Sequence, residues 1–325
     1  MTIDAKTRQM LEIFFCYDRK RVKEIKDERR LLAHYTTADT AMKIITNRKL
    51  WLRNAAVMND FSEIGYGKSV MAPALSGPLG DRFRAILDDI SQGLAGQVMA
   101  RHEDHSKHAR ESVFTSSLSE YDSDDPYGRL SMWRAYGGPV AGVALLFDGK
   151  VADIEVEPSL ECTVSPVLYG GTIEFIGEFA ELIDLLDANR AFLKKFDPAV
   201  ICNAAASVLQ FSMYSIKHPG FHEEREWRVI HRPYGYPSAH VAPQTVSLGG
   251  VPQSIYELPF HYPESGPLFN IPQLDLNSIL SAIILGPCAY PETIFRAFKD
   301  AMDAAGIQNA DKRILVSNIP LRQQW

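Results

Sequence analysis

The first thirty residues combine apolar and charged positions at helical spacing. Leu11, Phe14, Phe15 and Val22 fall on one face of a helix, while basic and acidic side chains occupy the other positions. Residues 5–30 therefore predict an amphipathic helix that packs its apolar face against a core. The segment after it, residues 31–36, is short, apolar and rich in residues that favour strands, so it predicts a strand.

Helical and strand periodicity alternate irregularly along the rest of the chain. Helices are predicted near residues 81–110, 129–136, 172–195, 198–217 and 292–305, with further ones capped by Thr37 or Asp39 and opening at Ser62. Strands are predicted near residues 49–53, 112–118, 142–147, 161–169, 226–231, 282–285 and 314–316, with a turn at 58–61. Residues 232–273 are rich in proline and glycine and predict a long loop.

This order of elements favours one fold class. The strands lack the regular spacing of β-α-β units, which favours an α+β fold over a doubly wound parallel sheet. No internal repeat or low-complexity linker divides the sequence. We therefore expect an N-terminal helix over residues 1–30 and a single α+β domain over residues 31–325.

Composition and charge exclude several classes of protein. The 325 residues are 46% hydrophobic and carry a net charge of -6, which is globular and offers no broad basic surface to nucleic acid. The four cysteines are far apart and form no CxxC pair, which indicates a reducing compartment and argues against a zinc site. Without a signal peptide or a window apolar enough to span a bilayer, the chain is expected to be cytoplasmic, with no membrane partner and no metal.

Three apparent motifs lack the required residues or spacing, and one further motif is absent from the sequence. Residues 65–69 end like a phosphate-binding loop, but a serine stands where its first glycine belongs. The histidines at 102, 105 and 108 would project in successively different directions from a predicted helix whose neighbouring residues are charged. Such a spacing is unusual for metal ligands and indicates a solvated surface. The acidic run at 122–125 lacks the glycine and distal glutamate of a calcium loop. No GxSxG elbow supports a serine hydrolase.

Two segments remain as candidate chemistry. His34-Tyr35-Thr36 ends a predicted strand, where a histidine is well placed to face a cleft. Glu224 and Glu226 stand at alternate positions of another predicted strand, and alternation would place both carboxylates on one face. From spacing alone, a charged strand start with ordinary ion pairs is the favoured interpretation of the second segment.

Motifs spread over residues 30–322 resemble a bacterial family known as domain of unknown function 2971. They occur in one order along the chain: His34-Tyr35-Thr36, Asn59-Asp60 with Glu63, Phe114-Thr115-Ser116, Met132-Trp133 with Tyr136, Glu224-x-Glu226-Trp227-Arg228, Ile284-x-Gly286-Pro287 and Ser317-x-Ile319-Pro320. The set together is specific, whereas each motif alone is not.

That family in turn resembles the ADP-ribosyltransferase-like superfamily, which includes DarT-type toxins and abortive-infection proteins. The resemblance implies a split sheet with several helical insertions and three motifs on separate strands. His34 matches the first motif, Thr115-Ser116-Ser117 the second and Glu226 the third, while Glu224-x-Glu226 is similar to the paired glutamates of the arginine-modifying branch. No tyrosine lies on the predicted Phe114 strand to stack on nicotinamide, which leaves Tyr35, Trp133 or Tyr136 for that role.

The resemblance implies an enzyme that cleaves the nicotinamide–ribose bond of NAD, its substrate, and transfers ADP-ribose to a nucleic acid or protein, as a toxin or phage-defence effector would. Glu226, Glu224 and His34 would be catalytic. The implied NAD-binding residues are His34, Tyr35, Thr36, Thr115, Ser116, Trp133, Tyr136 and Arg53, with Arg129 as the alternative to Arg53 at the pyrophosphate. With water as acceptor the chain would be an NAD hydrolase. The alternative from another class is a non-catalytic nucleotide-binding sensor or interaction module on the same fold.

Overall fold

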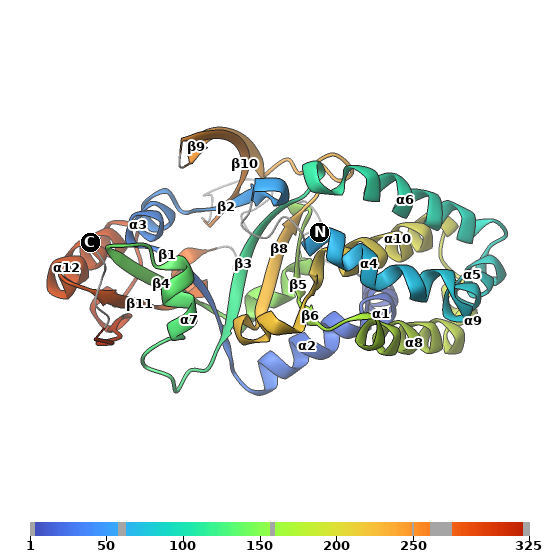
Figure 1. The fold of residues 1–325 in the computed structure, drawn as a ribbon, viewed down its shortest axis with the longest axis horizontal. Helices are drawn as coiled ribbons and strands as arrows, with labels where there is room; N and C mark the ends of the chain where they lie inside the picture. The colour runs from blue at the N-terminus through green and yellow to red at the C-terminus, as the bar shows by residue number, and fades with distance from the viewer. Residues whose placement is uncertain (1–3, 58–62, 157–159, 249, 261–274, 321–325) are drawn as a thin grey trace. The chain divides into compact units, whose positions relative to one another are not determined.

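The computed structural model describes residues 4–57, 63–156, 160–248, 250–260 and 275–320 (Figure 1). The chain forms two compact units, each assembled from three segments. Unit 1 comprises residues 1–23, 54–113 and 165–223, and unit 2 comprises residues 24–53, 114–164 and 224–325. The fold is α+β, as the irregular order of elements predicted. The predicted division at residue 30 remains a prediction.

Unit 1 is mainly helical. Its elements, with most of α2, are α1 (Ala5–Phe14), α2 (Cys16–Asp27), α4 (Glu63–Ser76), α5 (Pro78–Ile90), α6 (Leu94–Ser112), α8 (Thr172–Ala188), α9 (Arg190–Leu193), α10 (Pro198–Ser215) and the parallel pair β6 (Leu168–Tyr169) and β7 (Ile216–Lys217). A short 3-10 helix, Ala55–Val57, precedes α4, and another, Pro219–Glu224, follows β7. None of the described helices is long and apolar enough to cross a membrane.

Three long helices predicted from periodicity are interrupted. The predicted helix 5–30 divides into α1 and α2 because Phe15 leaves helical geometry, with φ -101° and ψ 43°. The predicted helix 81–110 divides into α5 and α6 at Gly93, whose φ of 78° suits a residue without a Cβ. The predicted helix 172–195 divides at Asn189 into α8 and α9. Apolar periodicity continues across such breaks because both helices pack on the same core.

Unit 2 contains the main sheet, apart from the last residues of β2 and β5. Its strands are β1 (Leu31–Thr37), β2 (Lys49–Asn54), β3 (Phe114–Tyr121), β4 (Ala141–Asp148), β5 (Cys162–Pro166), β8 (Glu226–His231), β9 (Ala242–Leu248), β10 (Val251–Pro259), β11 (Leu280–Cys288) and β12 (Ile314–Val316). The helices of this unit are α3 (Ala38–Asn47), α7 (Leu130–Tyr136), α11 (Leu276–Ile279), α12 (Pro291–Ala304) and the 3-10 segments Gly149–Val156 and Ala310–Lys312.

The sheet forks at β3. The strand order is β12-β11-β4-β1-β3-β2-β10-β9, and β8 pairs with both β3 and β5. A strand has two edges, so two of the three neighbours of β3 must share one edge. β8 pairs with residues 114–119 of β3, whereas β1 pairs only with residues 119–121. β1 and β2 therefore diverge along the edge that β8 leaves open, and β3 and β8 run side by side in Figure 1.

Three further differences from the sequence predictions matter for the site. The predicted loop 232–273 contains the antiparallel hairpin β9–β10, which turns near Gly250 at a φ of 81°. The sequence predicted a loop here because proline is unfavourable inside most strands. β3 extends to Tyr121, so a tyrosine does lie on the Phe114 strand, contrary to the prediction. The turn predicted at 58–61 and Asn59-Asp60 lie outside the described residues.

A buried carboxylate ties β1 to β3 and β8. Glu120 is 3% exposed, and its oxygens accept hydrogen bonds from Trp227 Nε1 at 3.0 Å and Arg30 Nη1 at 2.6 Å. We expect Arg30→Ala to lower the free energy of unfolding by about 1.5–3 kcal/mol, because a charged hydrogen bond to a buried group is lost. Glu28→Gln removes only one of the exposed partners of Arg30, which also pairs with Asp122, and should cost below about 1 kcal/mol. Urea unfolding of both variants tests this, and equal losses would contradict it.

Candidate functional site

Glu226 begins β8 and is held on two sides. Its side chain is buried, with the residue 6% exposed. Arg228 Nε donates to Oε1 at 3.0 Å and Arg228 Nη2 donates to Oε2 at 2.9 Å, forming a forked ion pair on one face of the strand. Ser117 Oγ on β3 donates to Oε1 at 2.6 Å. The carboxylate is thus fixed in position by two neighbours.

Glu224 does not share this geometry. It ends the 3-10 segment Pro219–Glu224, and Arg225 after it adopts a positive φ of 43°, so β8 begins only at Glu226. The prediction that alternation places both glutamates on one strand face is therefore wrong, because alternation applies only within a continuous strand. The backbone carbonyl of Glu224 accepts hydrogen bonds from Ser119 Oγ at 2.5 Å and Arg129 Nη1 at 3.1 Å.

His34 reaches the same part of β3 from the fork. The β1–β3 register runs from Leu31–Tyr121 to Ala33–Ser119, and at the next position His34 Nδ1 lies 2.9 Å from the Ser117 carbonyl oxygen. A carbonyl oxygen can only accept, so Nδ1 carries the proton. Burial lowers the pKa of His34, which favours the neutral ring. In that tautomer Nε2 is a hydrogen-bond acceptor.

The strand registers assign each side chain to a face of the sheet. Glu226 opposes Ser119, and Ser119 opposes Ala33, so Glu226 lies on the face of Ala33 and Tyr35. His34 follows Ala33 and therefore lies on the other face. Its ring contacts the backbone carbonyl of Ser117, whereas Glu226 accepts a hydrogen bond from the Ser117 hydroxyl. The two residues are therefore linked through Ser117 and are not in direct contact.

Thr115 and Arg53 share the Glu226 face. Thr115 lies two positions before Ser117 on β3, so both side chains lie on one face of the sheet. The Oγ1 of Thr115 is buried without a hydrogen-bond partner among the described residues. The ring of Tyr256 contacts Phe114, which places Tyr256 and its strand partner Leu52 on the opposite face from Thr115. Arg53, next to Leu52, therefore lies on the Thr115 face. It donates to Gln253 Oε1 over long distances of 3.4 Å, and burial lowers its pKa.

Ser116 and Thr36 are placed less favourably. Ser116 is 5% exposed, opposes Val229 and projects to the face opposite Glu226. Thr36 is half-buried and opposes Val143 on β4, on the same face of β1 as His34. Neither residue contacts Glu226 in the strand registers. Serine 117, third in the Thr115-Ser116-Ser117 motif, is the member that binds the carboxylate.

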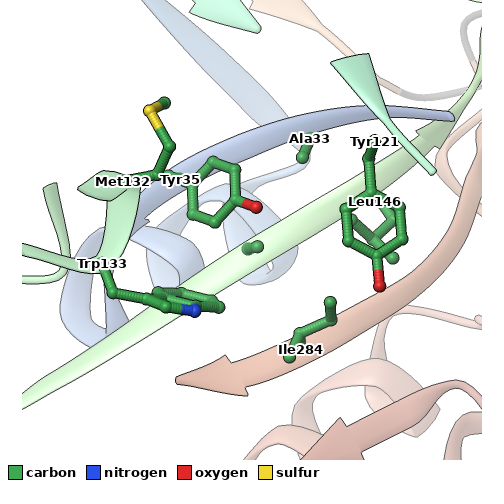
Figure 2. Packing of buried hydrophobic residues seen from close by; sticks show 8 residues of the cluster. Ala33, Tyr35, Tyr121, Met132, Trp133, Leu146 and Ile284 are labelled. Carbon is green, nitrogen blue, oxygen red and sulfur yellow. The ribbon is translucent and has the colours of Figure 1, made fainter. Parts of the chain in front are cut away.

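Tyr35 on β1 and Trp133 on α7 belong to one buried apolar cluster. Figure 2 shows the Tyr35 ring beside the Trp133 indole, and their centroids lie 4.8 Å apart at 76°. Tyr35 is 7% exposed and its hydroxyl accepts the Arg129 backbone N–H at 3.0 Å. Trp133 is 4% exposed and Nε1 donates to the Tyr127 carbonyl at 2.9 Å. Tyr136, at the end of α7, is the exposed member of the three candidate aromatics at 37%.

Glycines pack against the Trp133 indole. A Cβ added to Gly286 would lie 2.7 Å from Trp133 Cε3, and one added to Gly128 would lie 2.8 Å from Cζ2. A Cβ on Gly142 would lie 3.0 Å from Cε3. Backbone thus covers the ring where a stacked nicotinamide would need space. The indole is a core anchor in this structure.

We expect Gly286→Ala to destabilise the protein by about 1–3 kcal/mol, because the new methyl group overpacks the indole. Gly177→Ala is the matched control, since a Cβ there meets nothing within 4 Å inside helix α8. That control should raise stability by about 0.5–1 kcal/mol. Thermal unfolding of both variants decides the matter, and an unchanged melting temperature for Gly286→Ala would show that the packing is looser than described.

Two arginines organise this region through contacts that the sequence analysis, which named Arg228 in a motif and Arg129 as an alternative pyrophosphate ligand, did not predict. Arg228 follows Glu226 by two positions, the strand spacing that places both side chains on one face. Arg129 donates to Ser119 Oγ at 2.6 Å and to the carbonyls of Glu224 and Glu120, so its guanidinium holds β3 against the segment before β8. Only the alternation of Glu226 and Arg228 was visible in the sequence.

Comparisons with known proteins give one match. Neither curated proteins nor solved structures match this chain. The model of a family described as "Protein of unknown function (DUF2971)" matches residues 132–229. This segment contains Trp133, Glu226 and Arg228 and excludes His34 and Thr115. The match supports the relationship of this chain to the DUF2971 family of proteins of unknown function.

Proposed function

We propose that this chain cleaves the nicotinamide–ribose bond of NAD and transfers the ADP-ribose to a nucleic acid or protein. One observation carries the proposal. His34, Ser117 and Glu226 come from three strands of unit 2 and are linked by two contacts of 2.9 and 2.6 Å through Ser117. The resemblance to the ADP-ribosyltransferase-like superfamily assigns these three strands to the three motifs of an NAD site.

The proposed reaction breaks the C1'–N bond between ribose and nicotinamide. Nicotinamide leaves with the bonding electron pair as a neutral molecule, and positive charge develops on the ribose, as in glycoside cleavage. A nucleophile of the acceptor then attacks C1' and loses its proton to a base. Since the charge develops at the ribose, a fixed carboxylate beside it lowers the barrier.

Glu226 is the carboxylate that suits this role. Ser117 and Arg228 hold it in one orientation, so the carboxylate is positioned before the reaction begins. The same guanidinium offsets part of the negative charge, so Arg228 must shift toward the pyrophosphate for full effect. Glu224 is then left to the acceptor, as the general base that receives its proton.

Three other groups are suited to bind NAD. The buried Thr115 Oγ1 has no partner among the described residues and can bond a ligand hydroxyl. Arg53 lies on the same face and offers a guanidinium to the pyrophosphate. His34 is not one of these groups, because its side chain lies on the opposite face of the sheet from Glu226. Tyr136 is the exposed aromatic for a base or nicotinamide ring.

A second candidate is a nucleotide-binding sensor that performs no chemistry. Glu226 is already bonded by Arg228 and Ser117 and is 6% exposed, which favours a structural ion pair. This reading keeps the binding groups and removes the catalytic role of the carboxylate. It predicts NAD binding without nicotinamide release.

Two measurements on the purified chain test the proposal. Chromatography monitors the release of nicotinamide from NAD, and calorimetry measures the binding of NAD. Release supports the enzyme, and addition of DNA, RNA or protein acceptors then shows which one receives ADP-ribose. Binding with no release from any of these mixtures supports the sensor. If the chain neither binds NAD nor releases nicotinamide, the enzyme and the sensor are both ruled out.

A further inference from the structure

A cavity lies within unit 1. It encloses about 590 Å³ of empty space, counted to its open mouth, between α1, the start of α2, α8 and α10. That space is open to solvent on one side, and both aromatic and acidic side chains line it. Every residue that lines it belongs to unit 1.

Aromatic rings form a third of the described lining residues. Five buried phenylalanines contribute to the wall: Phe14, Phe15, Phe175, Phe179 and Phe211. Phe175 and Phe179 stack at 5.5 Å, and Phe15 meets Phe211 at 6.0 Å. Rings so arranged exclude water and leave apolar surface for an apolar ring or chain.

The polar part of the lining is acidic. Asp18 on α2 and Glu178 on α8 both line the cavity and are half-buried, and no lysine or arginine is among the described residues that line it. Ser215 donates to Ser165 at 3.1 Å, and Ser165 donates to Asp18, so the two hydroxyls orient one carboxylate. An apolar cavity with carboxylates in its lining complements a molecule that has an apolar part and a positively charged group.

We propose that this cavity binds a small apolar molecule that carries an ammonium group, with the ammonium paired to Asp18 and the apolar part against the phenylalanines. A neutral molecule would add no charge to pair with the Asp18 carboxylate, and an anion would be repelled by Asp18 and Glu178. The site is separate from the proposed NAD site and does not depend on the proposed reaction.

The pH dependence of binding follows from the charges around Asp18. Burial raises the pKa of Asp18 to about 6, while Ser165 and Arg19 oppose the shift. The other ionisable groups near it are Glu178 and Glu181 on α8 and the Cys16 thiol, whose pKa burial raises to about 11. About one Asp18 in ten is ionised at pH 5, so an ammonium ligand should bind about tenfold more weakly at pH 5 than at pH 8.

The test uses 2-phenylethylamine as the probe and 2-phenylethanol as its neutral counterpart, with calorimetry on the full chain. We expect the amine to bind below about 1 mM and the alcohol at least about tenfold more weakly. Asp18→Asn should reduce amine affinity about tenfold or more and remove its pH dependence, whereas Glu12→Gln, an exposed acid on α1, should change neither.

Three results would overturn the proposal: no binding of the amine, equal binding of the alcohol, or unchanged affinity in a folded Asp18→Asn variant. If that variant fails to fold, the wild-type comparison of amine and alcohol between pH 5 and pH 8 still decides, because only a carboxylate contact makes the amine alone pH-dependent. Circular dichroism of each variant separates lost binding from lost structure.

Discussion

Glu226→Gln should reduce nicotinamide release from NAD by roughly 100- to 1,000-fold, which is the loss of about 3–4 kcal/mol of transition-state stabilisation from one preorganised group. The amide keeps the shape of the side chain and an oxygen that can still accept from Ser117 and Arg228. It removes the negative charge that would face the developing positive charge on the ribose. NAD affinity should change much less, because that charge is absent from the ground state.

Glu224→Gln is the matched control for this result. Glu224 lies outside β8, and in the proposed mechanism it acts on the acceptor. Its substitution should leave hydrolytic nicotinamide release within about threefold of wild type and reduce transfer to an acceptor. Release that survives Glu226→Gln, in a variant with an unchanged circular dichroism spectrum, would remove Glu226 from the chemistry. Equal losses in the two variants would indicate a general effect on the fold.

Trp133→Ala should lower the free energy of unfolding by about 3–5 kcal/mol, the usual cost of deleting a buried tryptophan ring. The indole is 4% exposed, contacts Tyr35 and fills the space between three glycine positions. These glycines cannot close the cavity, because their backbone is fixed in β4, in β11 and in the turn before α7. Urea unfolding followed by circular dichroism measures the loss.

Tyr136→Ala separates packing from ligand stacking on the same helix. Tyr136 is 37% exposed, so its removal should cost below about 1 kcal/mol of stability. If Tyr136 stacks on NAD, its removal should weaken NAD binding by about 1–3 kcal/mol, or five- to 150-fold. A stable Trp133→Ala protein with weakened NAD binding would instead return the stacking role to the tryptophan. Both variants are compared at a temperature where each is folded.

Local patterns were sufficient for individual elements. The run of apolar residues from Leu31 predicted β1, and the segment Glu226–His231 predicted β8, although the expectation that Glu224 lies on the same strand was wrong. Thr37 was predicted as one of two caps for α3, and its hydroxyl does accept the Thr40 backbone N–H at 3.2 Å. These features depend on neighbours within a few residues, so the sequence contains the needed information.

Side-chain partners in the site depended on the registers between strands. Ser117 and Glu226 are 109 positions apart, and only the pairing of β3 with β8 places the hydroxyl 2.6 Å from the carboxylate. Arg129 and the Glu224 carbonyl are brought together in the same way. A shift of one residue in such a register would move every side chain to the other face, and no local pattern specifies it.

The sequence by itself determined most of the segments that form strands and helices, though not the β9–β10 hairpin or the breaks between helices. It also determined the α+β class and the residue types available for chemistry, because these follow from periodicity and capping within short windows. Only the tertiary structure decided that Glu224 lies outside the Glu226 strand, that Trp133 is enclosed by glycines, and that aromatic and acidic residues surround a cavity in unit 1. Each of these depends on a backbone conformation or packing contact between distant segments. Such contacts are set by the whole fold.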